Sequence, residues 1–133
     1  MAGTLTISTL SDGTNSTSST NCIQGSAKAW VNFTYISSTL TTVSSYNVSS
    51  VTRSSIGQYV ITFTSALADA NYAVVQGTGP ATTQTQPAQA HPMYSGITGL
   101  FITPTSSSFT VGVVTESNNA QIDPYNCALA VFR

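Results

Sequence analysis

Charged side chains are scarce in this chain. Lys and Arg together number three, Asp and Glu together number four, and charged residues make up 5% of the 133 residues. Soluble domains typically contain about a quarter of such residues. Nucleic acids and anionic membranes attract proteins through clusters of Lys and Arg. With a formal net charge of −1, the chain is expected to bind neither.

Cysteine and histidine are also few. Cys22 and Cys127 are too far apart for a zinc-binding motif, and His91 is the sole histidine. A disulfide between the two cysteines requires that the first and last strands be neighbours. The sequence leaves open whether they pair or remain separate thiols. Because phosphate-binding glycine loops and dinucleotide fingerprints are also absent, we expect no metal and no cofactor.

The few carboxylates do not indicate catalysis. Glycoside hydrolysis requires two carboxyl groups that face one cleft. Asp12, Asp69, Glu116 and Asp123 each fall in a predicted loop or turn, where Asp is common for backbone reasons. No Gly-x-Ser-x-Gly nucleophile motif accompanies His91. We therefore expect no catalytic residues and no enzymatic activity.

Targeting and membrane signals are lacking as well. The first residues show no basic region followed by an apolar run, as a signal peptide would. No apolar run approaches the length that spans a membrane. A nearly neutral protein with so few charges is prone to associate with itself. We expect a homo-oligomer that does not insert into membranes.

The most informative stretch runs from Gln24 to Tyr35. Its side chains alternate with the period of two that is typical of a strand with one buried face. One face carries Ala27, Ala29, Val31 and Phe33, and the other carries Lys28, Trp30 and Asn32. Trp30 is thus a large aromatic residue on the face of the strand that should be exposed to solvent. It predicts contact with a second sheet or another subunit, with sugar stacking as the alternative.

Short strands recur about every ten residues along the rest of the chain. The predicted strands are Tyr46–Arg53, Gln58–Thr64, Asn71–Thr78, Ile97–Thr103, Ser108–Thr115 and Asn126–Arg133. A helical turn is predicted only at Ala66–Ala70. The last strand is apolar on both faces and should be central or lie at an interface. The pattern predicts an all-β fold, an antiparallel β-sandwich of the jelly-roll or Greek-key type.

The N-terminal segment has a different pattern. Leu5 and Ile7 alternate with Thr and Ser, and a polar tract of Gly, Asn, Ser and Thr from residue 11 to residue 21 predicts a long loop. The segment is either an arm that docks on a neighbouring chain by strand addition or a first strand of the domain. We expect an arm or anchor at residues 1–21, with an interface at Leu5 and Ile7, and a sandwich domain at residues 22–133.

Two predicted loops are candidates for ligand contact. Residues 77–91 lack periodicity and predict an extended loop that ends at His91, with Pro92 next. Residues 116–125 predict a polar loop. Long loops in compact domains are often functional. We expect His91, Tyr94 and Tyr125 to face a ligand.

Several segments resemble proteins of tailed bacteriophages, especially those of marine and cyanobacterial hosts. The resemblance lies in the run Cys-Ile-Gln-Gly-Ser-Ala-Lys-Ala-Trp-Val-Asn-Phe at residues 22–33, in residues 46–64 and 66–75, and in Cys-Ala-Leu-Ala-Val-Phe-Arg at residues 127–133. Similar segments occur at the tips of tail fibres and in small virion proteins. Residues 76–125 show no such likeness.

The resemblance implies a non-enzymatic structural component of a phage virion. Since only a short arm precedes the domain, we expect an accessory protein mounted on the tail or capsid, made in the host cytoplasm and found in the virion. Its expected partners are copies of itself, with a homotrimer favoured, and other virion proteins. The alternative is a receptor-binding or carbohydrate-binding adhesin domain that contacts a host-surface glycan.

Overall fold

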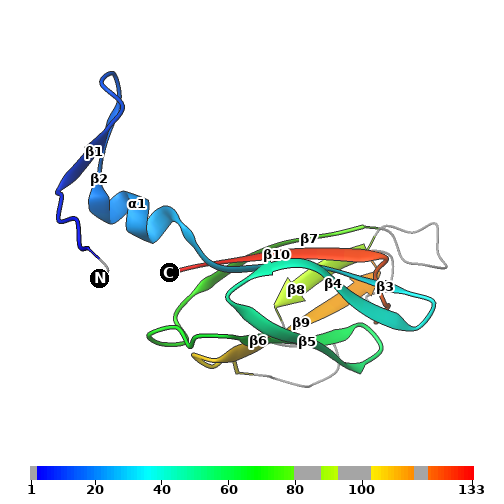
Figure 1. Cartoon of the computed structure of the whole chain (residues 1–133). Coiled ribbons are helices and arrows are strands. Elements are labelled where there is room, and N and C mark those ends of the chain that lie inside the picture. The colour runs from blue at the N-terminus through cyan, green and yellow to red at the C-terminus, as the bar shows by residue number, and fades with distance from the viewer. Residues whose placement is uncertain (1–2, 80–87, 93–102, 116–119) are drawn as a thin grey trace.

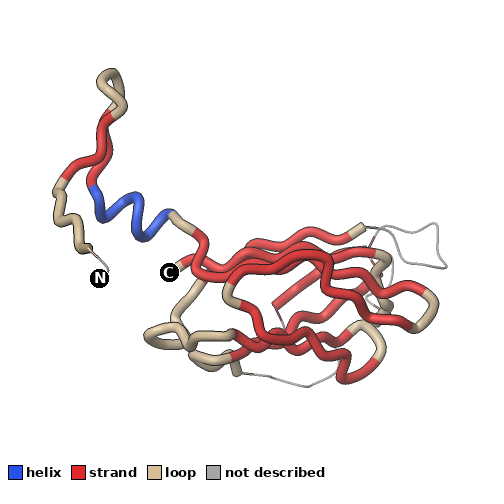
Figure 2. Tube along the Cα trace, in the orientation of Figure 1, coloured by secondary structure: helices blue, strands red, loops and turns tan. Residues whose placement is uncertain are grey.

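Two antiparallel sheets packed face to face form the body of the protein (Figures 1 and 2). The computed structural model describes residues 3–79, 88–92, 103–115 and 120–133. The first sheet has the order β4 (Thr39–Tyr46), β3 (Ala27–Ile36), β10 (Asn126–Phe132) and β7 (Ala73–Thr78). The second has the order β5 (Val48–Ser55), β6 (Gln58–Phe63), β9 (Ser108–Thr115) and β8 (Ala88–Pro92). The predicted all-β sandwich is confirmed.

The strand order brings the first and last strands of the body together. Hairpins join β3 to β4 and β5 to β6 within their sheets, whereas β4 to β5, β6 to β7, β7 to β8 and β9 to β10 pass between sheets. β10 pairs with β3 on one side and with β7 on the other. Its predicted central position is confirmed. Cys127, Leu129 and Val131 on its inner face are buried, whereas Ala128 on its outer face is exposed.

Alternate residues of the strands fill the space between the sheets. The first sheet contributes Ala29, Val31, Phe33, Cys127, Leu129 and Val131, and the second contributes Tyr59, Ile61, Phe63, Phe109, Val111 and Val113. The rings of Phe33 and Tyr59 lie 5.0 Å apart between their centroids and join the two layers. The buried face predicted for β3 is therefore confirmed. Burial of each Val, Leu, Ile or Phe among them stabilises the fold by about 1.5–3 kcal/mol.

Two backbone positions require special conformations. Asn47, between β4 and β5, has a φ of 54°, and its side chain donates to the carbonyls of Lys28 and Ser65 at 3.1 Å each. Asn tolerates the left-handed region better than most residues. Gly57 has a φ of +66°, and a Cβ there would lie 2.6 Å from the carbonyl oxygen of Val113. A side chain at position 57 would therefore be strained and would collide with the backbone, so this turn requires glycine.

One carboxylate fastens the segment before β10 to the second sheet. Asp123 accepts hydrogen bonds from Arg53 Nε at 2.9 Å and Nη2 at 2.8 Å. It also accepts from the backbone N–H of Gly57 at 2.9 Å and from the hydroxyl of Tyr59 at 2.7 Å. Burial alone would raise the pKa of Asp123, but these hydrogen bonds outweigh it and hold the pKa below its usual value of 3.8.

The only helix in the described residues differs from the prediction. Residues 66–70 form no helix. Instead α1 (Ser19–Gly25) lies in and just after the tract that was expected to be a loop, preceded by a hairpin of β1 (Thr9–Ser11) and β2 (Ser16–Ser18). Ser18 caps the helix, because its hydroxyl accepts from the N–H of Asn21 at 3.2 Å. The expected boundary between residues 21 and 22 falls inside this helix.

Three further points concern the strands. Two of them differ from what the sequence pattern indicates, and one concerns residues outside the described ranges. Adjacent apolar residues such as Val74 and Val75 are typical of a strand buried on both faces, but β7 is an edge strand and Val75 is exposed. Residues 88–92, expected in a loop, form β8 because they pair with β9. The strand expected at 97–103 lies almost wholly outside the described residues.

The Asp123 interactions predict a loss of stability in acid. A carboxyl group whose pKa is lowered by folding stabilises the native state above its unfolded pKa, and this contribution disappears as the pH falls through the folded pKa. The free energy of unfolding should therefore decrease as the pH is lowered below about 4. At pH 7, Asp123→Asn should reduce it by about 2 kcal/mol, since Arg53 loses its charged acceptor.

Denaturant unfolding from pH 7 to pH 2.5 measures both effects. Asp123→Asn should flatten the pH dependence, with a smaller slope left by Asp12 and Asp69, whose pKa values are also lowered by hydrogen bonds. Asp69→Asn is the matched control, because Asp69 forms the exposed pair with Arg133. An equal loss of stability at pH 7 in both variants would contradict the account.

Candidate functional site

The N-terminal arm, residues 3–25, projects from one end of the sandwich (Figure 1). Its residues are mostly exposed, including Leu5 at 81% and Ile7 at 40%. The structure places both beside Leu10, Cys22 and Ile23, around an open hollow of about 380 Å³. Exposed apolar side chains gathered in this way are typical of surfaces that contact another protein.

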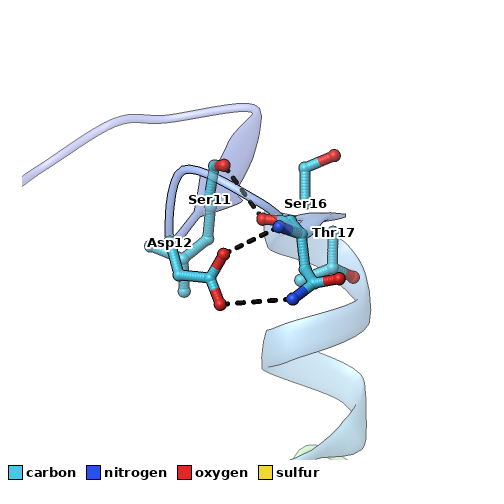
Figure 3. Close-up of a pocket in the computed structure, with 6 residues that line it drawn as sticks. Ser11, Asp12, Ser16 and Thr17 are labelled. Atoms are coloured by element: carbon cyan, nitrogen blue, oxygen red, sulfur yellow. Dashed lines mark hydrogen bonds between the residues drawn. The ribbon is translucent and has the colours of Figure 1, made fainter.

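Hydrogen bonds at the tip of the arm hairpin stabilise its turn. Asp12 and Asn15 are among the residues that line a second hollow of about 430 Å³, and Figure 3 shows Asp12 beside Ser11 in the turn of the hairpin. The carboxylate of Asp12 accepts from the N–H groups of Thr14 at 2.9 Å and Asn15 at 2.7 Å. These bonds lower the pKa of Asp12, the bond from the Asn15 N–H most of all. The hydrogen bonds hold the turn and leave no indication of catalysis.

A row of apolar side chains crosses the outer face of the first sheet. Trp30 on β3 lies opposite Tyr46 on β4 and opposite Ala130 on β10. Ala130 in turn lies opposite Val75 on β7. The exposed fractions are 39% for Trp30, 58% for Tyr46 and 61% for Val75. These four residues, the apolar row, extend over all four strands of the sheet.

The surroundings of the apolar row carry little charge. Lys28 is the one charged side chain that β3 contributes, and its Nζ donates to the backbone carbonyl of Ile23 and, at 2.9 Å, to the hydroxyl of Ser26. The next row of the sheet along β3 consists of Ser44, Asn32, Ala128 and Gly77. Small neutral neighbours leave the apolar row accessible to a flat apolar partner.

A cleft opens at the other end of the sandwich, beside the turns of two hairpins. The turn between β3 and β4 contributes Ser37 and Ser38, the β5–β6 hairpin contributes Arg53 and Ile56, and the segment before β10 contributes Asp123 and Tyr125. Its volume is about 450 Å³. The backbone N–H of Tyr35 donates to the carbonyl of Tyr125 at 3.2 Å and fixes this segment beside the end of β3.

The cleft holds a balanced ion pair. The guanidinium of Arg53 pairs with Asp123 and also lies 5.0 Å from the centroid of the Tyr35 ring. Burial, followed by the hydrogen bond to Asp123, raises the pKa of Tyr59 above its usual value, so this phenol stays neutral. Asp123 is the only carboxyl group among the described lining residues. A pair of carboxylates for acid–base catalysis is therefore absent from this part of the cleft.

The residues expected to face a ligand have three different outcomes. Tyr125 lies at the cleft with 48% of its surface exposed. His91 is not in a loop, because it belongs to β8 and lies opposite Gly112 of β9. Tyr94 lies outside the described residues. Of the three, only Tyr125 is placed by the structure at a hollow of the described surface.

Sequence reasoning did not single out Tyr35, Arg53, Ser37 or Ser38. Arg53 and Asp123 are 70 residues apart in the sequence, and no local pattern links them. Ser37 and Ser38 could have been found from the sequence, because they interrupt the alternation of strand residues. Such an interruption indicates the turn of a hairpin.

The cysteines do not form a disulfide. Cys127 is buried on the inner face of β10 opposite Phe33, whereas Cys22 lies in the arm helix. β3 and β10 are neighbours, but Cys22 precedes β3. Burial raises the pKa of Cys127 to about 12. Among the described residues, no cluster of His, Cys, Asp and Glu that could hold a metal is found, and no helix is long and apolar enough to cross a membrane.

Comparisons with models of known protein families, with curated proteins and with solved structures find no match for this chain. The resemblance to phage proteins therefore stays a prediction from the sequence.

The two thiols should react very differently. At pH 8 the native protein should be labelled by a thiol-specific reagent at Cys22, while Cys127 reacts at least about a hundredfold more slowly because it is buried and protonated. Both should react at similar rates in denaturant. Mass spectrometry of labelled peptides measures this, with Cys22→Ser as the control. Rapid labelling of Cys127 in the folded protein would contradict the packing of β10.

Proposed function

We propose that the protein is a non-enzymatic structural component of a phage virion, an accessory protein mounted on the tail or capsid. The observation that carries the proposal is the apolar surface left uncovered on the arm and on the first sheet. The phage itself comes from the sequence resemblance. Copies of the same chain, as a homotrimer, and other virion proteins are the proposed partners.

The apolar row supports self-association. Trp and Tyr are enriched at the energetic centres of interfaces, since they remove a large apolar area from water at a small cost in side-chain entropy. Trp30 and Tyr46 lie side by side on a flat face with little charge around them. A neighbouring copy that packs on this face would meet little charge, since Lys28 is the one charged side chain that β3 contributes.

The arm supports attachment to a neighbouring subunit. Its apolar side chains, among them Leu5 and Ile23, are exposed although residues of this kind are usually buried. Figure 1 shows that the arm leaves the sandwich at one end, while the turns beside the cleft lie at the other. Attachment through the arm would keep the cleft accessible.

A receptor-binding or carbohydrate-binding adhesin is the second candidate function. It is favoured by one specific observation, the half-exposed Tyr125 ring beside a cleft that also contains hydroxyl and guanidinium groups. The two functions are compatible, because the cleft and the arm lie at opposite ends of the domain.

Changes in the arm and the apolar row should separate attachment from folding. Deletion of residues 1–25, which removes α1 whole, should abolish incorporation into virions but leave the two-sheet domain folded. Trp30→Ala should weaken self-association by about thirtyfold or more, as loss of a central interface aromatic does. Analytical ultracentrifugation over a range of concentrations measures the association, and gel analysis of purified virions measures incorporation.

Ile56→Ala provides the matched control for Trp30→Ala. Ile56 is also an exposed apolar residue, but it lies beside the cleft, and its loss should leave self-association unchanged. A wild-type protein that stays monomeric at high concentration, or a protein lacking residues 1–25 that still enters virions, would disprove the proposed attachment.

A further inference from the structure

We propose that the cleft between the two hairpin turns and the segment before β10 binds one neutral sugar residue of a glycan, with Tyr125 as the stacking surface. The proposal rests on the second candidate function and names its site and ligand class. Four features of the cleft lead to it: its size and walls, its free donors, its charge balance and the backbone conformation at its rim.

The walls of the cleft suit the apolar face of a pyranose ring. A volume of about 450 Å³ lies within the range of roughly 300–1,000 Å³ found for ligand pockets. Ile56 is exposed at the rim and Tyr125 is half exposed. Sugars present a face of C–H groups that packs on aromatic rings, and Tyr adds a hydroxyl for their polar edge.

Arg53 supplies hydrogen-bond donors that are already oriented. A guanidinium carries five N–H groups, of which one on Nε and one on Nη2 bond to Asp123. The Tyr35 ring lies 5.0 Å from the same guanidinium. Held by these two contacts, and with 28% of its side chain exposed, Arg53 can donate its remaining N–H groups to sugar hydroxyls without losing further side-chain entropy.

The charge balance selects a neutral ligand. Arg53 and Asp123 cancel, and Asp123 already accepts from Arg53, Gly57 and Tyr59. A carboxylate sugar would have to compete with Asp123 for Arg53, and a cationic ligand would find a carboxylate whose oxygens already accept hydrogen bonds. A neutral sugar needs only the donors and hydroxyls that remain.

The rim of the cleft contains an unfavourable backbone conformation. Ser37 and Ser38 have φ values of 50° and 64°, in the left-handed region where a two-residue hairpin turn prefers Asn and Gly. Two serines there cost stability relative to Asn-Gly. Both serines line the cleft, and their hydroxyl groups are of the kind that pairs with the hydroxyls of a sugar.

The site is one of binding and not of hydrolysis. Among the described lining residues Asp123 is the single carboxyl group, and its pKa lies below the usual value, so it is ionised and cannot serve as a general acid at neutral pH. A bound glycan should therefore remain intact.

Titration of the full-length protein with methyl glycosides tests the proposal. The probes are methyl glycosides of glucose, galactose, mannose and N-acetylglucosamine, together with those of glucuronic and galacturonic acid, followed by NMR chemical shifts. At least one neutral glycoside should bind saturably, and the uronic acids should bind more weakly. Tyr125→Ala should reduce affinity about tenfold or more, while Tyr125→Phe should retain most of it.

Two further variants distinguish a direct role from a change in folding. The double variant Ser37→Asn with Ser38→Gly should raise the melting temperature, because the turn becomes favourable, and lower the affinity about three- to tenfold. Arg53→Lys should weaken binding, whereas Arg133→Lys, which alters the other Arg–Asp pair, should not.

The outcomes are decisive in both directions. Absence of saturable binding of every neutral glycoside, a preference for the uronic acids, or unchanged affinity in Tyr125→Ala would overturn the proposal. Failure of the attachment proposal is distinguishable, since Tyr125→Ala should still enter virions and a protein without its arm should still bind the glycoside.

Discussion

The pairing of β3 with β10 is the constraint on which the rest of the structure depends. It joins a strand near the start of the sandwich domain to the last strand of the chain, with Trp30 opposite Ala130 and Phe33 opposite Cys127. This register sends Val31, Phe33, Leu129 and Val131 into the core and places the apolar row on the outer face. A shift by one residue would exchange the two faces. The same pairing places the segment before β10 beside the hairpin turns, where Asp123 accepts hydrogen bonds from residues of the second sheet.

The result is a domain with two different ends and one exposed apolar face. The arm leaves one end, and the hairpin turns whose residues line the cleft lie at the other (Figure 1). Between them the outer face of the first sheet carries Trp30 and Tyr46, with little charge nearby. In a chain with 5% charged residues, charge repulsion is too weak to prevent such a face from associating with other molecules. Association through the face and the arm, with the cleft left open, is the arrangement that uses all three features.

Local periodicity in the sequence predicted the faces of the strands and the place of the last one. Alternation identified the buried face of β3, and the apolar residues on both faces of the predicted strand Asn126–Arg133 pointed to a central strand. Periodicity could not predict the Arg53–Asp123 pair or the cleft, because these arise from contacts between distant segments. Trp30 and Tyr125 were found because large aromatics at exposed positions are unusual.

The elements that the sequence did not reveal lack a local signal of their own. α1 was missed because its polar residues show no apolar stripe, although Ser18 could have signalled a cap. β8 was missed because residues 88–92 become a strand through pairing with β9.

The central claim is that neighbouring subunits cover the apolar row and the arm. A three-dimensional density map of a virion that contains this chain tests it most directly. The account predicts that Trp30, Tyr46 and the arm residues Leu5 and Ile7 contact adjacent subunits, while Tyr125 and the cleft face outward. A map in which the first sheet and the arm both lie in solvent, with no neighbouring chain against them, would contradict it.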